Sequence, residues 1–575
     1  MGRTRGIVSL FLVALLGACA PSAPPAGQAP GSAPATDASR EPRTLTMAVH
    51  YEPTALSPKH VETTGRLQDQ VRFFNAALAL IDATGLAHPY VASALPQLNT
   101  STWEVLPEGR METTYRLRPG LTWHDGTPFT AEDFEFAFQI YADSTLGLFV
   151  TTPQDRIEAI LAPDPQTVLI KWRALYPGAG ALMQGELEPL PRHLLERAFG
   201  TYAQDPTNQR ESFANLPFWT SGFVGVGPFR MDRWEPGTAI EGSAFDGHAL
   251  GRPKIDRVVM RFITDDNTVY ANILSENIQL AMRSVRFEQG IALKRAWERQ
   301  NRGNVLFIAG GTNTTMVQFR PDFLKVVELL DVRVRRALAH SIDRQALNDG
   351  LFEGQGLMSE TYLPPEVSYS SELDRAITKH PYDPRLSEQL MSEAGLTKAR
   401  DGFYLSSTGE RLTIPYLVVG GSEYERQGAI MTDTWRRAGF DIEQSILPAI
   451  QMTDGRARAT FPALLHNPLG IGERAAEYFT FAQAGSPSNR WGGNNRGGWS
   501  TPEYESLFQA HRSTLDLAER NKRMIEMMAM LSEVLPAFQA YFRFDIVAHL
   551  SELQGPALIS PDTRVNWNIH EWSLR

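Results

Sequence analysis

Apolar and polar residues repeat along the chain with two different periods. Residues 45–49 form a short, mostly apolar run, and over residues 257–262 the apolar side chains at 258, 260 and 262 share one face, which is typical of strands. Residues 113–118, followed by Pro-Gly, predict a further strand and a turn. Over residues 134–141 the apolar positions instead recur at i, i+3, i+4 and i+7, the spacing of one helix face. Such alternation along the chain predicts a mixed α/β fold.

Two helix starts are marked by residues that cap helices well. Thr130 precedes Glu132 and Asp133, whose negative charges complement the helix dipole at the N-terminal end. Asp343 follows an apolar helical stripe over residues 334–342 and is placed to cap the next helix. We interpret the aromatic and aliphatic side chains of these segments as core packing.

The first residues of the chain predict export and a lipid anchor. Arg3 and Arg5 precede an apolar run over residues 7–16, and Cys19, the only cysteine, follows small residues at 17–18. Residues 1–19 therefore resemble a bacterial lipoprotein signal peptide, which implies cleavage before Cys19 and lipid on its thiol. An ordinary cleaved signal with an incidental cysteine is the alternative. A spanning helix is disfavoured, because this run is too short to cross about 30 Å of hydrocarbon.

Residues 20–42 predict a disordered tether. They consist largely of Ala, Pro, Ser and Gly and lack aromatic and branched aliphatic side chains. Such a segment buries too little apolar surface to offset its chain entropy. We expect the folded body to begin near Leu45 and, with Cys19 lipidated, to fold without disulfides.

Composition excludes several classes of function. The 575 residues carry a formal net charge of -10 and no Lys/Arg-rich block, which argues against a nucleic-acid partner. The 12 histidines are scattered without an HExxH motif, so we expect no metal site and no cofactor. Neither Ser-x-x-Lys nor Gly-x-Ser-x-Gly occurs, so the common serine nucleophiles lack their sequence signs. We expect a binding protein and not an enzyme.

Several motifs in order along the chain resemble bacterial extracellular solute-binding proteins of family 5. This family contains the oligopeptide-, dipeptide- and nickel-binding components of ABC importers. The segments that carry the resemblance are 115–134 (YRLRPGLTWHDGTPFTAEDF), 225–230 (GVGPFR), 331–338 (DVRVRRAL) with 341–344 (SIDR), and 382–384 (YDP) with 393–395 (EAG). Each motif alone is weak, and together they indicate the family.

The resemblance implies a two-lobed periplasmic-binding-protein clamshell of type II, in the large cluster with an extra subdomain. Lobe one would comprise residues 43–70, 215–308 and 540–575, the extra subdomain residues 71–214, and lobe two residues 309–539. The implied partners are a small-molecule or peptide ligand and the ABC permease subunits in the membrane. We expect a monomer, lipid-anchored in the periplasm or on the outer face of the cytoplasmic membrane. A ligand-sensing lipoprotein with the same fold is the alternative function.

The ligand stays open between several classes. Peptide-binding members of the family hold the peptide's amino terminus with an aspartate in lobe two. Here the corresponding segment, residues 463–468, reads Ala-Leu-Leu-His-Asn-Pro, and the next carboxylate is Glu473. An ammonium without a counter-ion is costly in a cleft, so this sequence weakens the free-peptide interpretation. Oligosaccharides, opines and nickel chelates remain alternatives to a peptide-like solute.

Candidate ligand-binding residues follow from position and chemistry. His466 and Asn467 occupy the anchor segment, and a Gly/Asn-rich loop offers an aromatic face and amides. Tyr541 lies near the return of the chain to lobe one. The predicted contacts are His466, Asn467, Arg490, Trp491, Asn494, Asn495 and Tyr541, with core packing as the alternative for Trp491 and Tyr541 and a buried, satisfied ring for His466.

Overall fold

The computed structural model describes residues 41–57, 68–146, 153–448, 451, 454–489, 491–560 and 563–575. The chain divides into two units, residues 1–42 and residues 43–575. The second unit is described below. The predicted signal peptide, with Cys19, lies outside the described residues, as does all of the predicted tether except residues 41–42.

One large mixed sheet runs through the second unit. Its strands follow the order β16-β15-β17-β13-β18-β12-β1-β11-β10-β9, with the short strand β14 paired to β18. The pairs β1 with β11 and β15 with β16 are parallel, whereas β13 pairs antiparallel with β18 and β17. Sheets that mix these patterns with helical connections are typical of α/β folds.

Two long strands connect the two halves of this sheet. β13 (Gly303–Val317) and β18 (Ala537–Leu550) pair along almost their whole length, from Gly303 opposite Leu550 to Met316 opposite Ala537. Strands of this length extend over about 50 Å at 3.3 Å per residue. The register shifts twice along the pair, between Ala309 and Gly311 and between Asn313 and Thr314. Such bulges bend the strand and re-aim its side chains.

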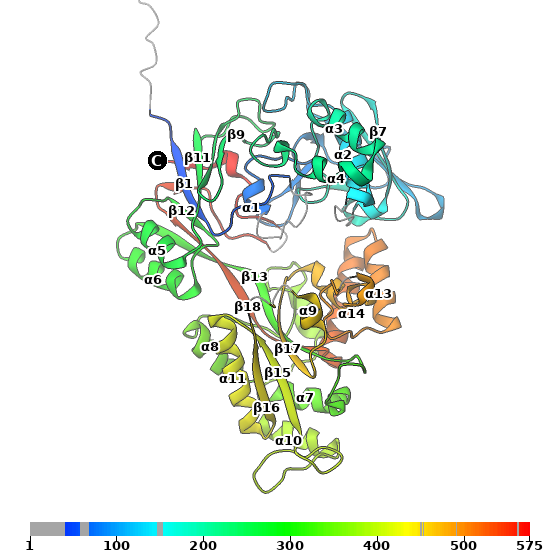
Figure 1. Ribbon diagram of the computed structural model, residues 1–575, viewed down its shortest axis with the longest axis vertical. Coiled ribbons are helices and arrows are strands. Elements are labelled where there is room, and N and C mark those ends of the chain that lie inside the picture. The colour runs from blue at the N-terminus through cyan, green and yellow to red at the C-terminus, as the bar shows by residue number, and fades with distance from the viewer. Residues whose placement is uncertain are drawn as a thin grey trace, which may run out of the picture. The chain divides into compact units, whose positions relative to one another are not determined.

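Two lobes follow from where the buried apolar side chains lie. The cores of the first lobe contain residues from Leu45 to Ile308 and from Ile546 to Trp572. The cores of the second lobe contain residues from Met316 to Tyr541. β13 and β18 pass from one set of cores to the other, as Figure 1 shows.

The first lobe contains one half of the large sheet and a smaller sheet. Its part of the large sheet consists of β1 (Thr44–Val49), β9 (Phe229–Glu235), β10 (Ala239–Ala244), β11 (Arg257–Phe262) and β12 (Leu280–Met282), with α1 (Gln68–Val71), α5 (Asp266–Leu274) and α6 (Phe287–Glu298). The smaller sheet consists of β4 (Ala92–Ala94), β5 (Trp103–Val105), β6 (Met111–Leu117), β7 (Ile157–Asp164) and β8 (Thr167–Trp172), with α2 (Glu132–Tyr141), α3 (Arg192–Gln204) and α4 (Pro206–Ala214). Short strand pairs are β2 (Ala79–Ile81) with β3 (Ala87–Pro89), and β19 (Leu553–Gln554) with β20 (Ser573–Leu574).

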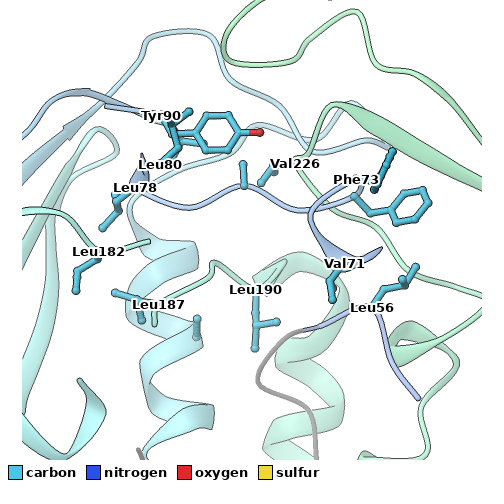
Figure 2. Close-up of a cluster of buried hydrophobic side chains, with 14 of the residues drawn as sticks. Leu56, Val71, Phe73, Leu78, Leu80, Tyr90, Leu182, Leu187, Leu190 and Val226 are labelled. Atoms are coloured by element: carbon cyan, nitrogen blue, oxygen red, sulfur yellow. The ribbon is translucent and has the colours of Figure 1, made fainter. Parts of the chain in front are cut away.

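Apolar side chains from distant segments hold the first lobe together. Figure 2 shows part of this core, where Leu56 lies beside Val71, and Leu190 and Val226 belong to the same cluster. Leu56, Val71 and Leu190 are at most 2% exposed. Burying a side chain of this size fully stabilises the folded state by about 1.5–3 kcal/mol. The core therefore ties α1 and its neighbours to segments more than a hundred residues away.

The second lobe packs helices on the other half of the sheet. Its strands are β14 (Leu357–Met358), β15 (Thr413–Val419), β16 (Asp441–Leu447) and β17 (Leu464–Leu469). Its helices are α7 (Val332–His340), α8 (Arg344–Phe352), α9 (Ser370–Ala376), α10 (Pro384–Glu393), α11 (Ser422–Ala438), α12 (Gly455–Ala459), α13 (Pro502–Ser513) and α14 (Leu517–Val534). Trp435 of α11 is fully buried, and its indole N–H donates to the Leu338 carbonyl of α7 at 3.0 Å. This bond fixes α11, whose N-terminal turn contributes to the site below.

The local predictions agree with these elements at their centres. β1, β6 and β11 lie at the predicted strands, and Asp343 caps α8 by accepting a hydrogen bond from Ala346 N at 2.9 Å. The N-cap of α2 is Ala131, one residue after the predicted cap Thr130, and Asp133 accepts the Thr130 N–H at 3.0 Å. In the turn predicted after β6, Gly120 adopts φ 72°, which favours glycine.

Candidate functional site

A cavity of about 260 Å³ lies between the lobes beside the strand β18. The first lobe contributes the end of β1, α1 and the segment from β12 into α6. The second lobe contributes the end of α8 and the first turns of α11. The charged residues that line it are Asp69, Asp266, Arg283, Arg286, Glu288, Glu423, Arg426, Arg543 and Asp545. A cavity with this many charges suits a polar ligand that contacts both lobes.

Two glycines of β13 make room for the charged side chains of β18. Arg543 and Asp545 stand two residues apart in β18, and both face the cavity. A Cβ on Gly310 would lie 1.9 Å from Asp545 Oδ2, and a Cβ on Gly311 would lie 2.6 Å from Arg543 Nη2. Real side chains do not approach so closely, so a residue larger than glycine at either position would force Asp545 or Arg543 to move. The bulge at Ala309 and Gly311 thus positions both charges.

Arg283 links three elements through buried ion pairs. Its Nε lies 3.1 Å from Asp69 Oδ2 of α1, and its Nη1 lies 3.4 Å from Asp545 Oδ2 of β18. Arg564 approaches the other Asp69 oxygen at 3.8 Å. Burial alone would lower the pKa of Arg283, but the two carboxylates outweigh it and raise the pKa. Asp69 is 1% exposed, so these partners lie with it in the interior.

Arg283 also adopts a backbone conformation that is rare for its residue type. Its φ is 54°, in the left-handed region that disfavours side chains with a Cβ. Such a conformation costs about 1–3 kcal/mol and persists where surrounding interactions enforce it. Here the ion pairs with Asp69 and Asp545 supply those interactions.

Glu423 presents a carboxylate from the first turn of α11. Its Oε1 accepts hydrogen bonds from Asn313 Nδ2 at 3.2 Å and from the Tyr541 hydroxyl at 3.3 Å. Burial raises the pKa of Glu423, and the positive charge of Arg543 lowers it only in part, so the pKa stays above its usual value. Glu423 is half-buried and lines the cavity. A carboxylate in this setting gains from a cationic partner.

Two of the predicted site residues lie together behind Glu423. Tyr541, fully buried, has its hydroxyl 2.9 Å from Gln427 Oε1 as well as 3.3 Å from Glu423 Oε1, and its single hydrogen is shared between these two acceptors. His466, also fully buried, lies with Nε2 3.0 Å from Gln427 Oε1, so Nε2 carries the proton. Burial lowers the pKa of His466 to about 3, which keeps the ring neutral. These residues form a polar layer between α11 and the crossing strands.

The remaining predicted residues lie in other surroundings. Asn467 is fully buried, and its side chain accepts from Arg458 and contacts the Met316 sulfur at 3.6 Å. Asn495 is 2% exposed and donates to the Thr480 and Trp499 carbonyls, at 3.0 and 2.6 Å. This bonding pattern fixes the loop backbone.

Trp491 and Asn494 are half-buried in the same loop. Trp491, at φ 61°, packs edge-on against Phe323, and the Arg456 guanidinium lies 5.7 Å from its ring. Arg490 lies outside the described residues. None of the described predicted residues lines the cavity. Their roles as ligand contacts stay predictions.

Sequence reasoning missed the charged residues that do line the cavity. Arg543 and Asp545 interrupt an otherwise mostly apolar strand at alternate positions, and Gly310-Gly311 falls in the strand opposite. Charged residues at i and i+2 share one face of a strand, and in a buried strand such side chains are rare unless they are paired. That signal was available in the sequence. Glu423 carried none, because an acidic residue in a first helical turn is common.

The described ranges contain neither a metal-binding cluster nor a membrane-spanning helix. No three His, Cys, Asp or Glu side chains of these ranges are grouped so that they could hold a metal ion. Among the helices of the same ranges, none has the length and apolar character needed to cross a bilayer.

The chain belongs to the bacterial extracellular solute-binding proteins, family 5. The model of this family's middle part matches residues 94–489, which is more than half of the chain. This result confirms the family that the sequence motifs indicated. Proteins of this family bind solutes.

Curated relatives are similar at low identity. A putative ABC transporter peptide-binding protein of Brucella ovis is 25% identical over 299 residues, 52% of this chain and 51% of the relative. The match thus spans about half the length of that relative. The dipeptide-binding protein of Escherichia coli (strain K12) is 22% identical over 488 residues, 78% of this chain and 79% of the relative.

Solved structures confirm the fold. An oligopeptide-binding protein from Thermus thermophilus, complexed with a pentapeptide, superposes with a TM-score of 0.72 at 20% identity, over 93% of this chain and 96% of the other. NikZ from Campylobacter jejuni, in complex with Ni(L-His), gives a TM-score of 0.71 at 20% identity, over 93% of this chain and 100% of NikZ. These likenesses establish the predicted two-lobed α/β class.

Proposed function

We propose that this chain is the extracytoplasmic solute-binding component of an ABC importer. A small solute occupies the cavity beside β18, and the loaded protein delivers it to the membrane permease. The observation that carries this proposal is the cavity itself, because both lobes and the strand that joins them contribute charged side chains to it. A solute that contacts both lobes stabilises the arrangement in which they approach each other. Membership of the solute-binding family supports the same conclusion.

In this proposal the protein binds its solute without transforming it. The charged groups of the cavity are arranged as ion pairs and polar contacts, which serve recognition. Energy for transport would come from separate ATPase and permease chains.

The proposal includes a lipid anchor at Cys19 and a tether over residues 20–42. The mature protein would then act as a monomer in the periplasm or on the outer face of the cytoplasmic membrane. Expression of Cys19→Ser in a bacterial host, followed by fractionation and mass measurement of the N-terminal peptide, tests this directly. We expect the native chain in the membrane fraction with a lipid-modified peptide, and the variant in the soluble fraction.

We also propose the division of the body given by the sequence. Lobe one would comprise residues 43–70, 215–308 and 540–575, the extra subdomain residues 71–214, and lobe two residues 309–539. The separate hydrophobic cores on either side of β13 and β18 support the separation of lobe one, with its extra subdomain, from lobe two.

Binding and uptake together test the main proposal. Purified protein is screened by thermal shift and calorimetry against short peptides, oligosaccharides, opine-like compounds and nickel chelates. A solute at one hundred times its Kd adds about 2.7 kcal/mol to the free energy of unfolding. A strain that lacks the gene should then fail to take up the same solute. A hit without any loss of uptake favours the sensing alternative, and the absence of any hit contradicts solute binding.

A further inference from the structure

Most charges in the cavity are paired with each other. The pairs are Arg283 with Asp69 and Asp545, Arg426 with Glu288, and Arg286 with Asp266. Two charged side chains lack such a partner. Within the described part of the chain, neither Glu423 nor Arg543 has an oppositely charged side-chain atom within 4.0 Å. The cavity therefore holds one carboxylate and one guanidinium that remain available.

The Glu423 carboxylate is held in place from one side only. Both of its hydrogen bonds, from Asn313 and Tyr541, go to Oε1. Its Oε2 accepts no hydrogen bond from any described residue. Asn313 and Tyr541 are both fully buried, and Tyr541 is itself bonded to Gln427 at 2.9 Å, so the carboxylate is oriented by fixed groups. Oε2 is left to receive a donor from a ligand.

The Arg543 guanidinium is held in a similar way. Its Nη1 donates to the Tyr424 hydroxyl at 3.0 Å, and the side chain passes over Gly311, which leaves it room. Tyr424 is the residue after Glu423 in the first turn of α11. The two unpaired charges therefore share one helical turn as support. A guanidinium has five N–H donors, so most of its donors are not used by Tyr424.

Partly buried charges of opposite sign select for a ligand that carries both signs. Glu423 and Arg543 feel each other's charge, but neither makes a direct ionic contact. A neutral sugar would remove water from both groups without giving either one such a contact, which is costly. A ligand with only an ammonium would pair with Glu423 and leave Arg543 unmatched. A zwitterion with an ammonium and a carboxylate pairs with both groups. The volume of about 260 Å³ lies below the usual range for drug-sized ligands, so the ligand is small.

We propose that the cavity binds a small zwitterion, with its ammonium on Glu423 and its carboxylate on Arg543. This assignment rests on the proposed solute-binding function and names the ligand class and the two residues that select it. The cation anchor then lies in the first turn of α11. The segment at 463–468, where the sequence lacks a carboxylate, need not supply it.

The experiment uses calorimetry on the purified full-length protein. Free amino acids and di- and tripeptides form the zwitterion panel, and neutral oligosaccharides and nickel chelates form the comparison panel. The tightest zwitterion is then measured again with its amine acetylated and, separately, with its carboxylate amidated. Because each cap removes one partner of a buried charge pair, we expect each to weaken binding by about 30-fold or more.

Two variants test which residue binds each end of the ligand. Glu423→Gln should lose affinity for the zwitterion and no longer discriminate against the acetylated form, while amidation still weakens its binding. Arg543→Gln should also lose affinity for the zwitterion. It should no longer discriminate against the amidated form, while acetylation still weakens its binding. Glu443→Gln on β16 and Arg437→Gln on α11 alter exposed residues of the same types and serve as controls that should bind like the native protein. The capped ligands test the native protein itself, so the result does not depend on the variants folding.

Each outcome decides between the two proposals. The assignment is supported if acetylation and amidation each weaken zwitterion binding to the native protein, and if Glu423→Gln loses the sensitivity to acetylation and Arg543→Gln the sensitivity to amidation. Zwitterion binding that is indifferent to capping overturns it, as does binding of only sugars or chelates, and both results leave solute binding intact. If no solute of either panel binds, solute binding itself fails.

Discussion

The carboxylate of Asp545 occupies the space that a side chain on Gly310 would need. The two residues lie on the paired strands β18 and β13, and a Cβ on Gly310 would come within 1.9 Å of Asp545 Oδ2. Asp545 in turn pairs with Arg283 of the first lobe. A backbone position in one crossing strand thus controls where a cavity charge lies.

Gly310→Ala should therefore destabilise the protein. The added methyl group must displace Asp545 or shift β13, and overpacking of this kind costs about 1–3 kcal/mol. We expect the free energy of unfolding in urea to fall by about 3 kcal/mol. Gly200→Ala is the matched control, because Gly200 lies inside α3 with open space around it, and alanine there should add about 0.5–1 kcal/mol. Equal stability of the two variants contradicts the steric argument.

Asp69→Asn should cost more than the loss of an ordinary surface carboxylate. The substitution leaves the buried Arg283 with one acid and weakens the pairing of Arg564. Removing one partner from a buried pair costs about 3–5 kcal/mol because the other charge stays buried. Asp433→Asn removes an exposed partner of Arg437, and exposed pairs contribute about 0–1 kcal/mol. Urea unfolding of both variants measures the difference, and a change below 1 kcal/mol in both would show that the Asp69 network is dispensable.

Local features of the fold were predictable because their causes are local. The cap at Asp343 and the strand at residues 257–262 depend only on neighbouring residues, and both lie where the sequence placed them. The family motifs further indicated the two-lobed class. At α2 the N-cap is Ala131 and not the predicted Thr130, and Thr130 instead donates its backbone N–H to Asp133 inside the helix.

The cavity was not predictable in the same way, because its residues come from distant segments. Asp69, Arg283, Glu423 and Asp545 are brought together only by the pairing of β13 with β18 and the packing of α11. The periodicity of apolar residues describes one helix or strand at a time and does not show which distant residues lie close together in the fold. His466 and Tyr541 were chosen for their positions, and the structure places them together around Gln427, behind the cavity wall.

Stability should decrease as the pH falls below 6.5, because buried histidines must stay neutral. Burial lowers the pKa of His124 to about 4, against 6.5 in the unfolded chain. Since the unfolded state binds the proton first, His124 contributes its full stability above pH 6.5 and loses it progressively down to about pH 4. At one pKa unit per 1.36 kcal/mol, its share of the loss at pH 5 is about 2 kcal/mol.

His124→Gln measures that share. His124 Nε2 lies 3.0 Å from the Gly227 carbonyl oxygen, and Nδ1 accepts from Gly225 N at 3.2 Å. The variant should be less stable at pH 7.5 because these bonds change, yet its stability should fall less steeply between pH 6.5 and 5 than that of the native protein. The native protein, measured in the same buffers, is the reference. Parallel slopes for the two proteins would exclude His124 as a source of the pH dependence.

Asp155→Asn should weaken solute binding although Asp155 lies outside the cavity lining. Asp155 Oδ2 lies 3.2 Å from Arg512 Nη2, and this pair joins the first lobe to α13 of the second. Leu515, just beyond α13, also packs against the core of the first lobe. The contact forms only when the lobes are close, so its loss lowers the population of the closed form and, with it, the apparent affinity.

The expected size of this effect is small and specific. An exposed ion pair contributes up to about 1 kcal/mol, which corresponds to about a two- to fivefold weaker Kd by calorimetry. Arg512→Gln should have a similar effect, and the double variant should be no weaker than either single one, because the pair is already broken. Asp401→Asn breaks an ion pair within the second lobe, with Arg411, and should leave the Kd unchanged. If the Asp155 and Asp401 variants shift the Kd equally, the effect is one of surface charge and not of lobe closure.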